Sequence, residues 1–265
     1  MLGAIIGDIV GSRFEWDNIK SKNFDFFHKD CFFTDDTVMT LAIGAALSEC
    51  AGNYENLSNI AIKNMQQIGK LYPDCGYGLR FDDWLYEDNP KPYNSWGNGA
   101  AMRVSLCAYF ANSIEMVKDL SYKVTSVSHN HEEGIKGAEA TSVATYMALS
   151  GKNKTDIAEY INKNYYKIDF TLDKIRRRYA FNESCQGTVP YALQAFFESE
   201  NFEDALRNAI SIGGDSDTIG AITGAVAGAY YGIDEKTENI ALKYIDDTLL
   251  KIYKKIQTAL KYKEP

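Results

Sequence analysis

The stretch GGDSDTIGAITGAVAGAYYG, residues 213–232, decides the fold because it joins an acidic cluster to a ladder of glycines. The glycines recur every four residues from Gly220 to Gly232, and GAIIGDIVG, residues 3–11, has a ladder with the same spacing. Residues four apart share one face of a helix. Each glycine costs a helix about 1 kcal/mol relative to alanine, so close backbone contact is the expected compensation. We expect these two helices to pack together in the centre of the molecule, with acidic residues at their ends.

Charged residues place both ladders in a water-soluble protein. Glycine ladders are best known from membrane helices, but Asp8 and Arg13 accompany the first ladder, while Asp215 and Asp217 precede the second. No uncharged run approaches the roughly 18 residues of a membrane span. The N-terminus is apolar but has no basic leader. We therefore expect neither a signal peptide nor a membrane helix.

Composition indicates one globular domain over residues 1–265. The chain is 45% hydrophobic and 24% charged, which is ordinary for such a protein. Its net charge of −8 makes it a poor general binder of nucleic acid or anionic membranes. An anionic substrate would need local help from metal ions or backbone amides. The five cysteines are widely spaced and form no CxxC motif, so we expect reduced thiols in a cytoplasmic protein, which is expected to be a monomer.

Helical periodicity dominates the chain, and no strand–turn–strand pattern is evident. An aromatic segment at 24–33 is short, and 72–97, with three prolines, is expected to be a long irregular loop. The expected fold is a compact, all-α, single-domain bundle. Besides the second glycine ladder, helices are expected over residues 3–15, 35–50, 58–70, 98–111, 113–127, 131–149, 155–164, 171–180, 187–199, 203–211 and 235–262.

Two acidic clusters of the same form lie far apart, each at the start of an apolar helical run. They are TDDT, residues 34–37, and DSDT, residues 215–218. Helix capping needs one oxygen, whereas each cluster offers three. Carboxylates brought together repel one another unless a cation lies between them. Because Mg²⁺ prefers oxygen ligands, the clusters predict a divalent, two-metal hydrolase site that forms where the fold joins them.

Two familiar acidic motifs do not fit the second cluster. An EF-hand beginning at Asp215 requires an oxygen ligand at its fifth position and Glu at its twelfth. This chain has Ile219 and Val226 there. A phosphatase with an aspartyl nucleophile has Asp-x-Asp-x-Thr after a strand, whereas Thr218 comes one residue early and in a helical context.

Further acids and histidines each allow two interpretations. Asp8 and Glu15 are seven residues apart and share a helix face if the helix extends that far. A carboxylate there could bind metal or act as a base, and Glu15 could equally pair with Arg13. A metal could bind His129 and His131, but no third His or Cys ligand is near. A polar cap or a ligand contact is therefore the preferred interpretation.

The segment SWGNGAAMR, residues 95–103, has the form of a glycine-rich loop that enters a helix. Free backbone N–H groups in such a loop can bind phosphate, although Asn-Gly is also a common turn. The segment is neither a Walker loop nor a dinucleotide fingerprint. Nearby aromatic side chains could stack on a base or pin a long loop to the surface. They are Tyr77, Phe81, Trp84, Tyr93 and Trp96.

Together these motifs resemble the ADP-ribosylglycohydrolase family, which includes the dinitrogenase reductase-activating glycohydrolases. Six segments carry the resemblance, in the family's order, and jointly they are more specific than any one alone. They are GAIIGDIVGSRFE (3–15), FTDDTVMTLA (33–42), SWGNGAAMRVS (95–105), SVSHNHEEGIKGAEA (126–140), SCQGTVPYAL (184–193) and IGGDSDTIGAITGAVAGA (212–229). The match is weakest over 153–180 and after about Asp234.

The resemblance implies an all-α fold that holds two Mg²⁺ or Mn²⁺ ions. The implied metal ligands are Thr34, Asp35, Asp36, Asp215, Asp217 and Thr218. The implied catalytic acids are Glu15, which matches a glutamate that gates or activates the site in some members, and Asp36. Other members place the general base elsewhere, for which Asp82 and Asp83 are candidates. The implied substrate contacts are Ser95, Gly97, Asn98, Gly99 and Met102 around the pyrophosphate, and His129 beside the adenosine portion.

The implied activity is hydrolysis of the glycosidic bond between ADP-ribose and an acceptor, which reverses ADP-ribosylation. The acceptor would be a protein side chain such as arginine or serine, or part of a small ADP-ribose derivative. The metals would hold the distal ribose, a carboxylate would position water against an oxocarbenium-like centre, and loop amides would neutralise the pyrophosphate. The alternatives are another metal-dependent phosphohydrolase, or a non-catalytic crystallin-like or ADP-ribose-binding protein. Retention of all six metal-ligand candidates favours an enzyme.

Overall fold

The computed structural model describes residues 1–262, and helices make up its regular structure. Within these residues the extended pairing is a single isolated bridge between Gly97 and Ser184. The all-α expectation is therefore confirmed. In chain order the helices are α1 (Leu2–Ser12), α2 (Asp35–Glu49), α3 (Leu57–Gly69), α4 (Leu79–Tyr86), α5 (Gly99–Met102), α6 (Ser105–Phe110), α7 (Ile114–Thr125), α8 (Glu132–Leu149), α9 (Lys154–Asn164), α10 (Leu172–Ile175), α11 (Cys185–Phe197), α12 (Phe202–Ser211), α13 (Ser216–Tyr231), α14 (Glu235–Ala241) and α15 (Asp247–Lys261).

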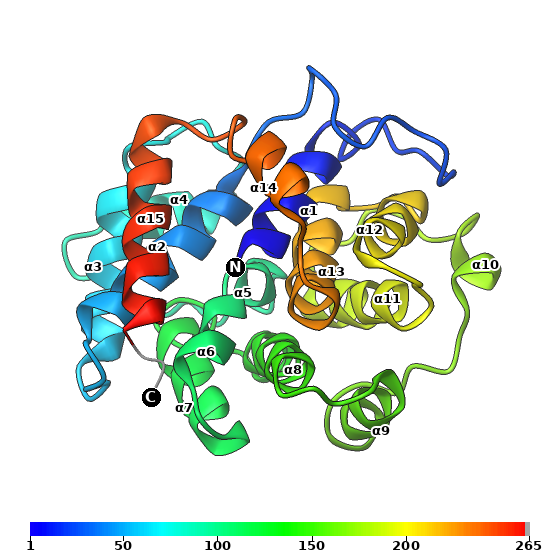
Figure 1. Cartoon of the computed structure of the whole chain (residues 1–265). Helices are drawn as coiled ribbons and strands as arrows, with labels where there is room; N and C mark the ends of the chain where they lie inside the picture. The colour runs from blue at the N-terminus through cyan, green and yellow to red at the C-terminus, as the bar shows by residue number, and fades with distance from the viewer. Residues whose placement is uncertain (263–265) are drawn as a thin grey trace.

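Helices α1 and α13 form the central pair of the molecule (Figure 1). A Cβ added to Gly7 would overlap the carbonyl oxygen of Gly220, and one added to Gly3 would overlap that of Gly224. As the position rises by four on α1, it falls by four on α13, so the two helices are antiparallel. The glycine ladders thus allow backbone contact between the helices, as their spacing predicts.

This antiparallel register determines where the acidic residues lie. The last glycine of the α1 ladder, Gly11, faces Ser216 and Asp217 at the start of α13. The segment that follows α1 is therefore delivered to the N-terminus of α13. Gly232 is a correction to the predicted ladder, because it follows the last residue of α13 with a φ of +76°, and a Cβ added to it would meet no atom within 4 Å.

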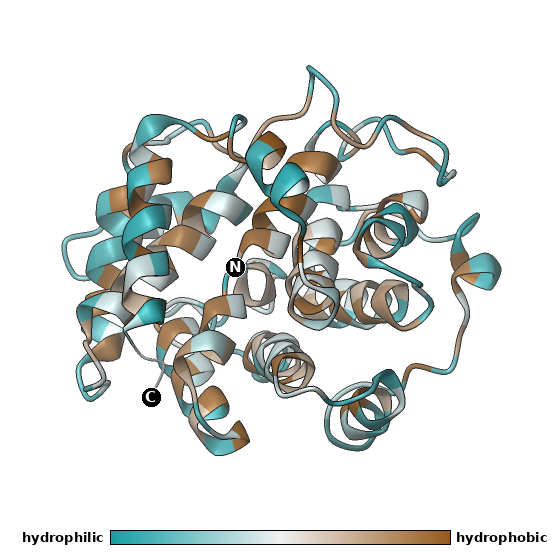
Figure 2. Cartoon of the chain, viewed as in Figure 1, coloured by the Kyte–Doolittle hydropathy of each residue, from teal (hydrophilic) through white to brown (hydrophobic). Residues whose placement is uncertain are grey.

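The other helices bury this pair. Helix α13 packs against α8, α11 and α12, and α1 also packs against α2. The residues of α13 from Ser216 to Ala227 are all buried. Figure 2 shows hydrophobic residues concentrated on the central helices and hydrophilic ones on outer elements such as α10. A largely buried helix pair therefore carries one acidic cluster and supports the other.

Several predicted helix boundaries were wrong, and capping explains the largest error. The predicted helix 235–262 is two helices, α14 and α15, because Asp246 takes an extended conformation and accepts hydrogen bonds from the N–H groups of Thr248 and Leu249. The predicted helix 98–111 is likewise divided into α5 and α6. There the carbonyl of Met102 accepts a bond from Thr40 instead of continuing the helical ladder.

Three more expectations need correction. Helix α1 ends at Ser12 instead of residue 15, so Glu15 lies on the segment after it. The predicted helix 171–180 shrinks to α10, whose only buried residue is Leu172, so little packing stabilises a longer helix. The predicted irregular region 72–97 contains α4, whose buried residues are Phe81, Trp84 and Leu85. Their spacing is the helical signal that the prolines in this region obscured.

Candidate active site

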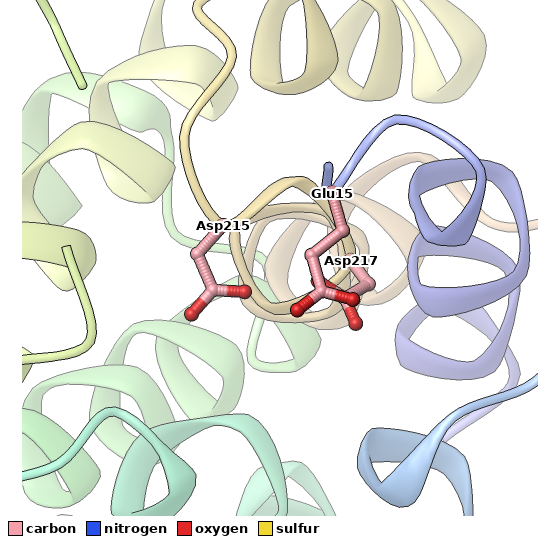
Figure 3. Close-up of side chains that lie close together, drawn as sticks. All are labelled: Glu15, Asp215 and Asp217. Atoms are coloured by element: carbon pink, nitrogen blue, oxygen red, sulfur yellow. The ribbon is translucent and has the colours of Figure 1, made fainter. Parts of the chain in front are cut away.

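Acidic side chains from three elements converge where α1 ends and α2 and α13 begin. Ligand oxygens of Glu15, Asp215 and Asp217 all lie within 4.8 Å of one another. Figure 3 shows Asp215 and Asp217 projecting from the start of α13 towards Glu15, which follows α1. The hydroxyl of Thr218 donates a 3.1 Å hydrogen bond to Asp36 of α2. The predicted meeting of the two acidic clusters is therefore present.

The position of α2 is set by Asp8, which is fully buried on α1. Its carboxylate accepts hydrogen bonds from the backbone N–H groups of Thr34 and Thr37, each 3.0 Å long, and from both threonine hydroxyls. Thr34 also caps α2 by accepting from the N–H of Asp36. Asp8 thus anchors the N-terminus of α2, and it holds Thr34 outside the lining of the cleft described below.

The start of α13 is held by Asn18 and Lys20, in the segment after α1, which sequence analysis did not single out. Gly213 and Gly214 have φ values of +67° and +83°, in the left-handed region that favours glycine. Asn18 brackets Gly214 with two hydrogen bonds, one to its N–H at 2.6 Å and one to its carbonyl at 2.9 Å. Lys20 donates to the carbonyls of Ile212 and Tyr179. The chain after α1 is therefore tied to the turn that positions Asp215.

Two buried carboxylate oxygens have no hydrogen-bond partner among the described residues. They are Oδ1 of Asp36 and Oδ1 of Asp217. An orphaned buried carboxylate oxygen is costly unless a cation or donor satisfies it. Oxygen donors grouped in this way suit a hard divalent cation. The residues present therefore fit the metal site that the sequence predicted.

Electrostatics supports the same conclusion. We define the carboxylate cluster as Asp8, Glu15, Asp35, Asp36, Asp215 and Asp217. Burial raises the pKa of every member, and repulsion from other members raises most of these values further. The pKa rises to about 6 for Asp8 and Asp215, to about 7 for Glu15, and well above the ordinary value for Asp35, Asp36 and Asp217. Full ionisation of the cluster is therefore unfavourable unless a cation compensates its charge.

All members of the carboxylate cluster except Asp8 line one cleft of about 560 Å³. Five of the six predicted metal ligands line it, Thr34 being the exception, and so do all six predicted substrate contacts. We call the part of the cleft lined by Asp35, Asp36, Asp215, Asp217 and Thr218 its carboxylate end, and the part lined by Ser95, Gly97, Asn98, Gly99, Met102 and His129 its other end. Neither Asp82 nor Asp83 lines this cleft.

The second end of the cleft is the glycine loop, residues 95–99. The N–H of Gly97 donates to the hydroxyl of Ser95 at 3.1 Å, and the N–H of Asn98 donates to the carbonyl of Glu183 at 2.7 Å. The side chain of Asn98 donates to Asp215 at 2.6 Å. Asn98 therefore belongs to both ends, since it sits in the loop and holds a carboxylate of the cluster.

Some of the aromatic residues near the glycine loop line the cleft, and others support the elements around it. Tyr77, Phe81 and Tyr93 line the cleft. Trp84 is buried and donates its indole N–H to the carbonyl of Val127 at 3.2 Å, so it holds α4 in place. Trp96 lines an adjoining hollow of about 510 Å³.

The rim of the cleft carries an aromatic pair that sequence analysis missed. Trp16 is 79% exposed and stacks on Phe181, with ring centroids 5.0 Å apart. Both side chains line the cleft, next to Glu15 and Glu183. Trp16 directly follows Glu15, so this exposed aromatic surface lies at the carboxylate end. Nothing in the local periodicity marks Trp16, because it lies in irregular chain.

Arg103 is a second residue of the cleft that sequence analysis did not single out. Its side chain is 1% exposed and lines the cleft beside His129. Its available signal was a charged residue within an otherwise apolar helical pattern. His131, by contrast, caps α8 by accepting from the N–H of Glu133 at 3.1 Å. The expectation of a polar cap is therefore confirmed for His131.

No helix in the described part of the chain is long and apolar enough to cross a membrane. The described chain also contains five free cysteines.

Comparisons with known proteins identify the family. The sequence model described as ADP-ribosylglycohydrolase matches residues 1–256. ADP-ribosylhydrolase ARH3 of Xenopus tropicalis is 25% identical, over 89% of this chain and 87% of that protein. ADP-ribosylarginine hydrolase Tri1 of Pseudomonas putida is 26% identical, over 88% and 70% of the two chains. ADP-ribosyl-[dinitrogen reductase] glycohydrolase of Rhodospirillum rubrum is 27% identical, over 76% and 70%.

A solved structure has the same fold. A solved structure of an ADP-ribosylglycohydrolase-related protein complex superposes with a TM-score of 0.66. The superposition covers 98% of this chain and 93% of the other, at 22% identity. The family match spans nearly the whole sequence, and the site lies within it. This protein therefore belongs to the ADP-ribosylglycohydrolase family.

Proposed function

We propose that this protein hydrolyses the glycosidic bond between ADP-ribose and an acceptor, and so reverses ADP-ribosylation. The observation that carries the proposal is one cleft with the carboxylate cluster at one end and the glycine loop at the other. Similarity to relatives named as hydrolases of ADP-ribosylated acceptors supports it. The proposed substrate is an ADP-ribosylated protein, and the proposed enzyme is a cytoplasmic monomer with reduced cysteines.

The carboxylate cluster would hold two Mg²⁺ or Mn²⁺ ions through Asp35, Asp36, Asp215, Asp217 and Thr218, with Thr34 as a sixth ligand or as a support through Asp8. Bound ions would supply Lewis-acid stabilisation of coordinated oxygens. The unpartnered oxygens of Asp36 and Asp217 support this assignment.

The chain's own groups have distinct tasks in this proposal. Glu15 faces the cleft from the segment after α1 and would position a water molecule or accept its proton, with Asp36 as the second catalytic acid. Gly99 offers a backbone N–H that has no partner among the described residues. Together with Ser95 and His129, it would bind the pyrophosphate and adenosine portions.

The direct test measures ADP-ribose release from arginine-linked and serine-linked ADP-ribosylated peptides, with Mg²⁺, Mn²⁺ or EDTA. Asp217→Asn keeps the shape of the side chain and removes its charge, and we expect roughly 100-fold to 1,000-fold slower release. Asp88→Asn, on an exposed loop away from the cleft, is the matched control and should behave like the wild type.

Each other outcome identifies an alternative. Cleavage of the pyrophosphate instead of release of intact ADP-ribose would make the protein a phosphohydrolase. Binding of ADP-ribose without release from any peptide would make it a binding protein. If the protein neither binds nor releases ADP-ribose, then ADP-ribose is not its ligand. If release occurs, the peptide that reacts faster identifies the acceptor linkage.

A further inference from the structure

Arg103 is a buried cation without a carboxylate partner. Its guanidinium lies over the ring of Phe81, 5.2 Å from the centroid, and its Nη2 donates to the hydroxyl of Ser128 at 2.7 Å. Among the described residues no acid lies within ion-pair distance of it, and its Nε has no hydrogen-bond partner. Burial lowers its pKa only to about 10, so it remains charged at neutral pH. A buried charge of this kind needs a specific role to offset its desolvation cost.

The neighbours of Arg103 limit how the hydrogen bonds of His129 can be arranged. Nδ1 of His129 lies 2.8 Å from the hydroxyl of Ser128 and 3.4 Å from Nη2 of Arg103. Arginine can only donate, and the oxygen of Ser128 accepts from Arg103, while Nδ1 of His129 is the one acceptor that the described residues offer to the Ser128 proton. A protonated Nδ1 would have to donate to the second lone pair of the Ser128 oxygen, would leave the serine proton without an acceptor, and would lie beside the Arg103 cation. The arrangement of donors therefore favours Nδ1 as the acceptor.

The other ring nitrogen, Nε2, faces the glycine loop. It lies 3.5 Å from the position that a Cβ would take on either Gly97 or Gly99. The His129 ring is otherwise enclosed by aromatic rings, Tyr93 at 5.6 Å and Phe81 at 6.1 Å between centroids. Burial and the charge of Arg103 lower the pKa of His129 well below its usual value. The imidazole is thus neutral and points its Nε2 into the cleft.

We propose that Arg103 is a positioning residue that acts through Ser128 on His129. It holds the imidazole in the neutral tautomer with the proton on Nε2, so that the ring donates a hydrogen bond to an oxygen of the bound ligand. The identity of that ligand as ADP-ribose rests on the proposed function, whereas the tautomer does not. The glycines opposite Nε2 keep the space into which this bond is directed.

The tautomer can be observed directly, because the chain contains only three histidines. In ¹⁵N-labelled wild-type protein at pH 7.5, two-bond ¹⁵N–¹H correlations distinguish a protonated ring nitrogen from an unprotonated one. His131 is the internal reference, since its Nδ1 accepts a backbone N–H, and His→Gln variants assign the three signals. We expect His129 to show an unprotonated Nδ1 and a protonated Nε2. A protonated Nδ1 in the wild type would overturn the proposal, whatever the variants do.

Variants then test the dependence on Arg103. Arg103→Gln removes the charge and offers both a donor and an acceptor, so we expect a mixture of His129 tautomers and about tenfold weaker binding of ADP-ribose, as expected for a lost hydrogen bond to a charged group. Arg80→Gln removes an equal charge from the cleft lining. Arg80 hydrogen-bonds to Tyr93 and contacts neither Ser128 nor His129, so the His129 tautomer in this variant should match that of the wild type. Arg103→Lys restores the charge and should recover part of the binding.

The outcomes separate the possible failures. An unchanged His129 tautomer in folded Arg103→Gln, with binding no weaker than in Arg80→Gln, would overturn the role of Arg103. If the Arg103 variants do not fold, Ser128→Ala decides, because it keeps the cation and removes the relay; an unchanged tautomer there overturns the proposal. Wild-type protein that shows the expected tautomer but does not bind ADP-ribose contradicts the proposed function, and the tautomer assignment stands.

Discussion

The two ends of the cleft are built from opposite chemistry. At one end the carboxylate cluster gathers acids around oxygens that lack partners. At the other end the glycine loop lies beside a neutral histidine and the buried cation Arg103. Only Asn98 belongs to both, through its 2.6 Å hydrogen bond to Asp215. A ligand that spans the cleft would therefore meet cation-binding groups at one end and donors for an anion at the other.

The difference teaches how a chain of net charge −8 can hold an anionic ligand. Helices α2 and α13 both begin at the carboxylate cluster, and the N-terminus of a helix favours negative charge. Two helix N-termini together therefore stabilise acids that would otherwise repel one another. At the glycine loop, Arg103 supplies a positive charge where no acid pairs with it. The fold therefore places negative and positive groups in different parts of the cleft, which the net charge of the chain does not reveal.

The largest effect is expected from breaking the helix pair that supports both ends. Gly7→Ala places a methyl group on the carbonyl of Gly220, where only backbone can move, and should destabilise the protein by about 3 kcal/mol or more. Thermal unfolding measures the change. Gly78→Ala is the matched control, because Gly78 has a φ of −61° and no atom within 4 Å of an added Cβ. A Gly7→Ala protein as stable as this control would contradict the backbone contact between α1 and α13.

A smaller effect is expected from cutting the connection between the ends. Asn98→Ala removes the donor to Asp215 and should weaken Mn²⁺ binding and ADP-ribose release by roughly 10-fold to 100-fold, as for other supports of metal ligands. Calorimetric titration with Mn²⁺ measures the first effect, and the peptide assay measures the second. Thr188→Ser keeps the hydroxyl that Asn98 also contacts and serves as the control. Weaker ADP-ribose binding with unchanged Mn²⁺ affinity would assign Asn98 to the glycine loop alone.

The smallest effect is expected in the dependence of the melting temperature on pH and on divalent metal. The folded pKa values of the carboxylate cluster lie above the ordinary values of 3.8 for Asp and 4.5 for Glu, reaching about 6 for Asp8 and about 7 for Glu15. The folded state therefore holds more protons than the unfolded state between about pH 4 and 7, and the contribution of these groups to stability falls as pH rises through that window. In EDTA, the melting temperature should be a few degrees higher at pH 5.5 than at pH 7.5.

Divalent metal should reverse this dependence, because it stabilises the ionised carboxylates and its binding releases protons. Melting curves at both pH values, with EDTA or MnCl₂, make the comparison. The Asp217→Asn variant should show a weaker response to MnCl₂ than Asp88→Asn. Equal melting temperatures in EDTA and MnCl₂ at pH 7.5 would contradict a metal site in the carboxylate cluster.

Much of the fold and part of the site were predictable from short-range patterns. The glycine spacing predicted the contact of α1 with α13, since a glycine face has few uses other than close approach. The clusters 34–37 and 215–218 predicted two helix starts with more oxygens than capping requires. The roles of Asn18, Lys20 and Trp16 were not predictable, because each depends on a partner more than 160 residues away in the chain. All three also lie in an irregular segment without periodicity.

By itself, the sequence determined the all-α class, the central helix pair, the two acidic half-sites and the family, because periodicity and local chemistry are properties of neighbouring residues. Only the tertiary structure decided that Asp8 anchors α2 instead of facing the cleft, that α1 ends before Glu15, and that Arg103 is buried beneath His129. These features depend on the register between helices and on which groups lose their water. Such long-range packing depends on contacts between distant parts of the chain, so it cannot be predicted from any short segment.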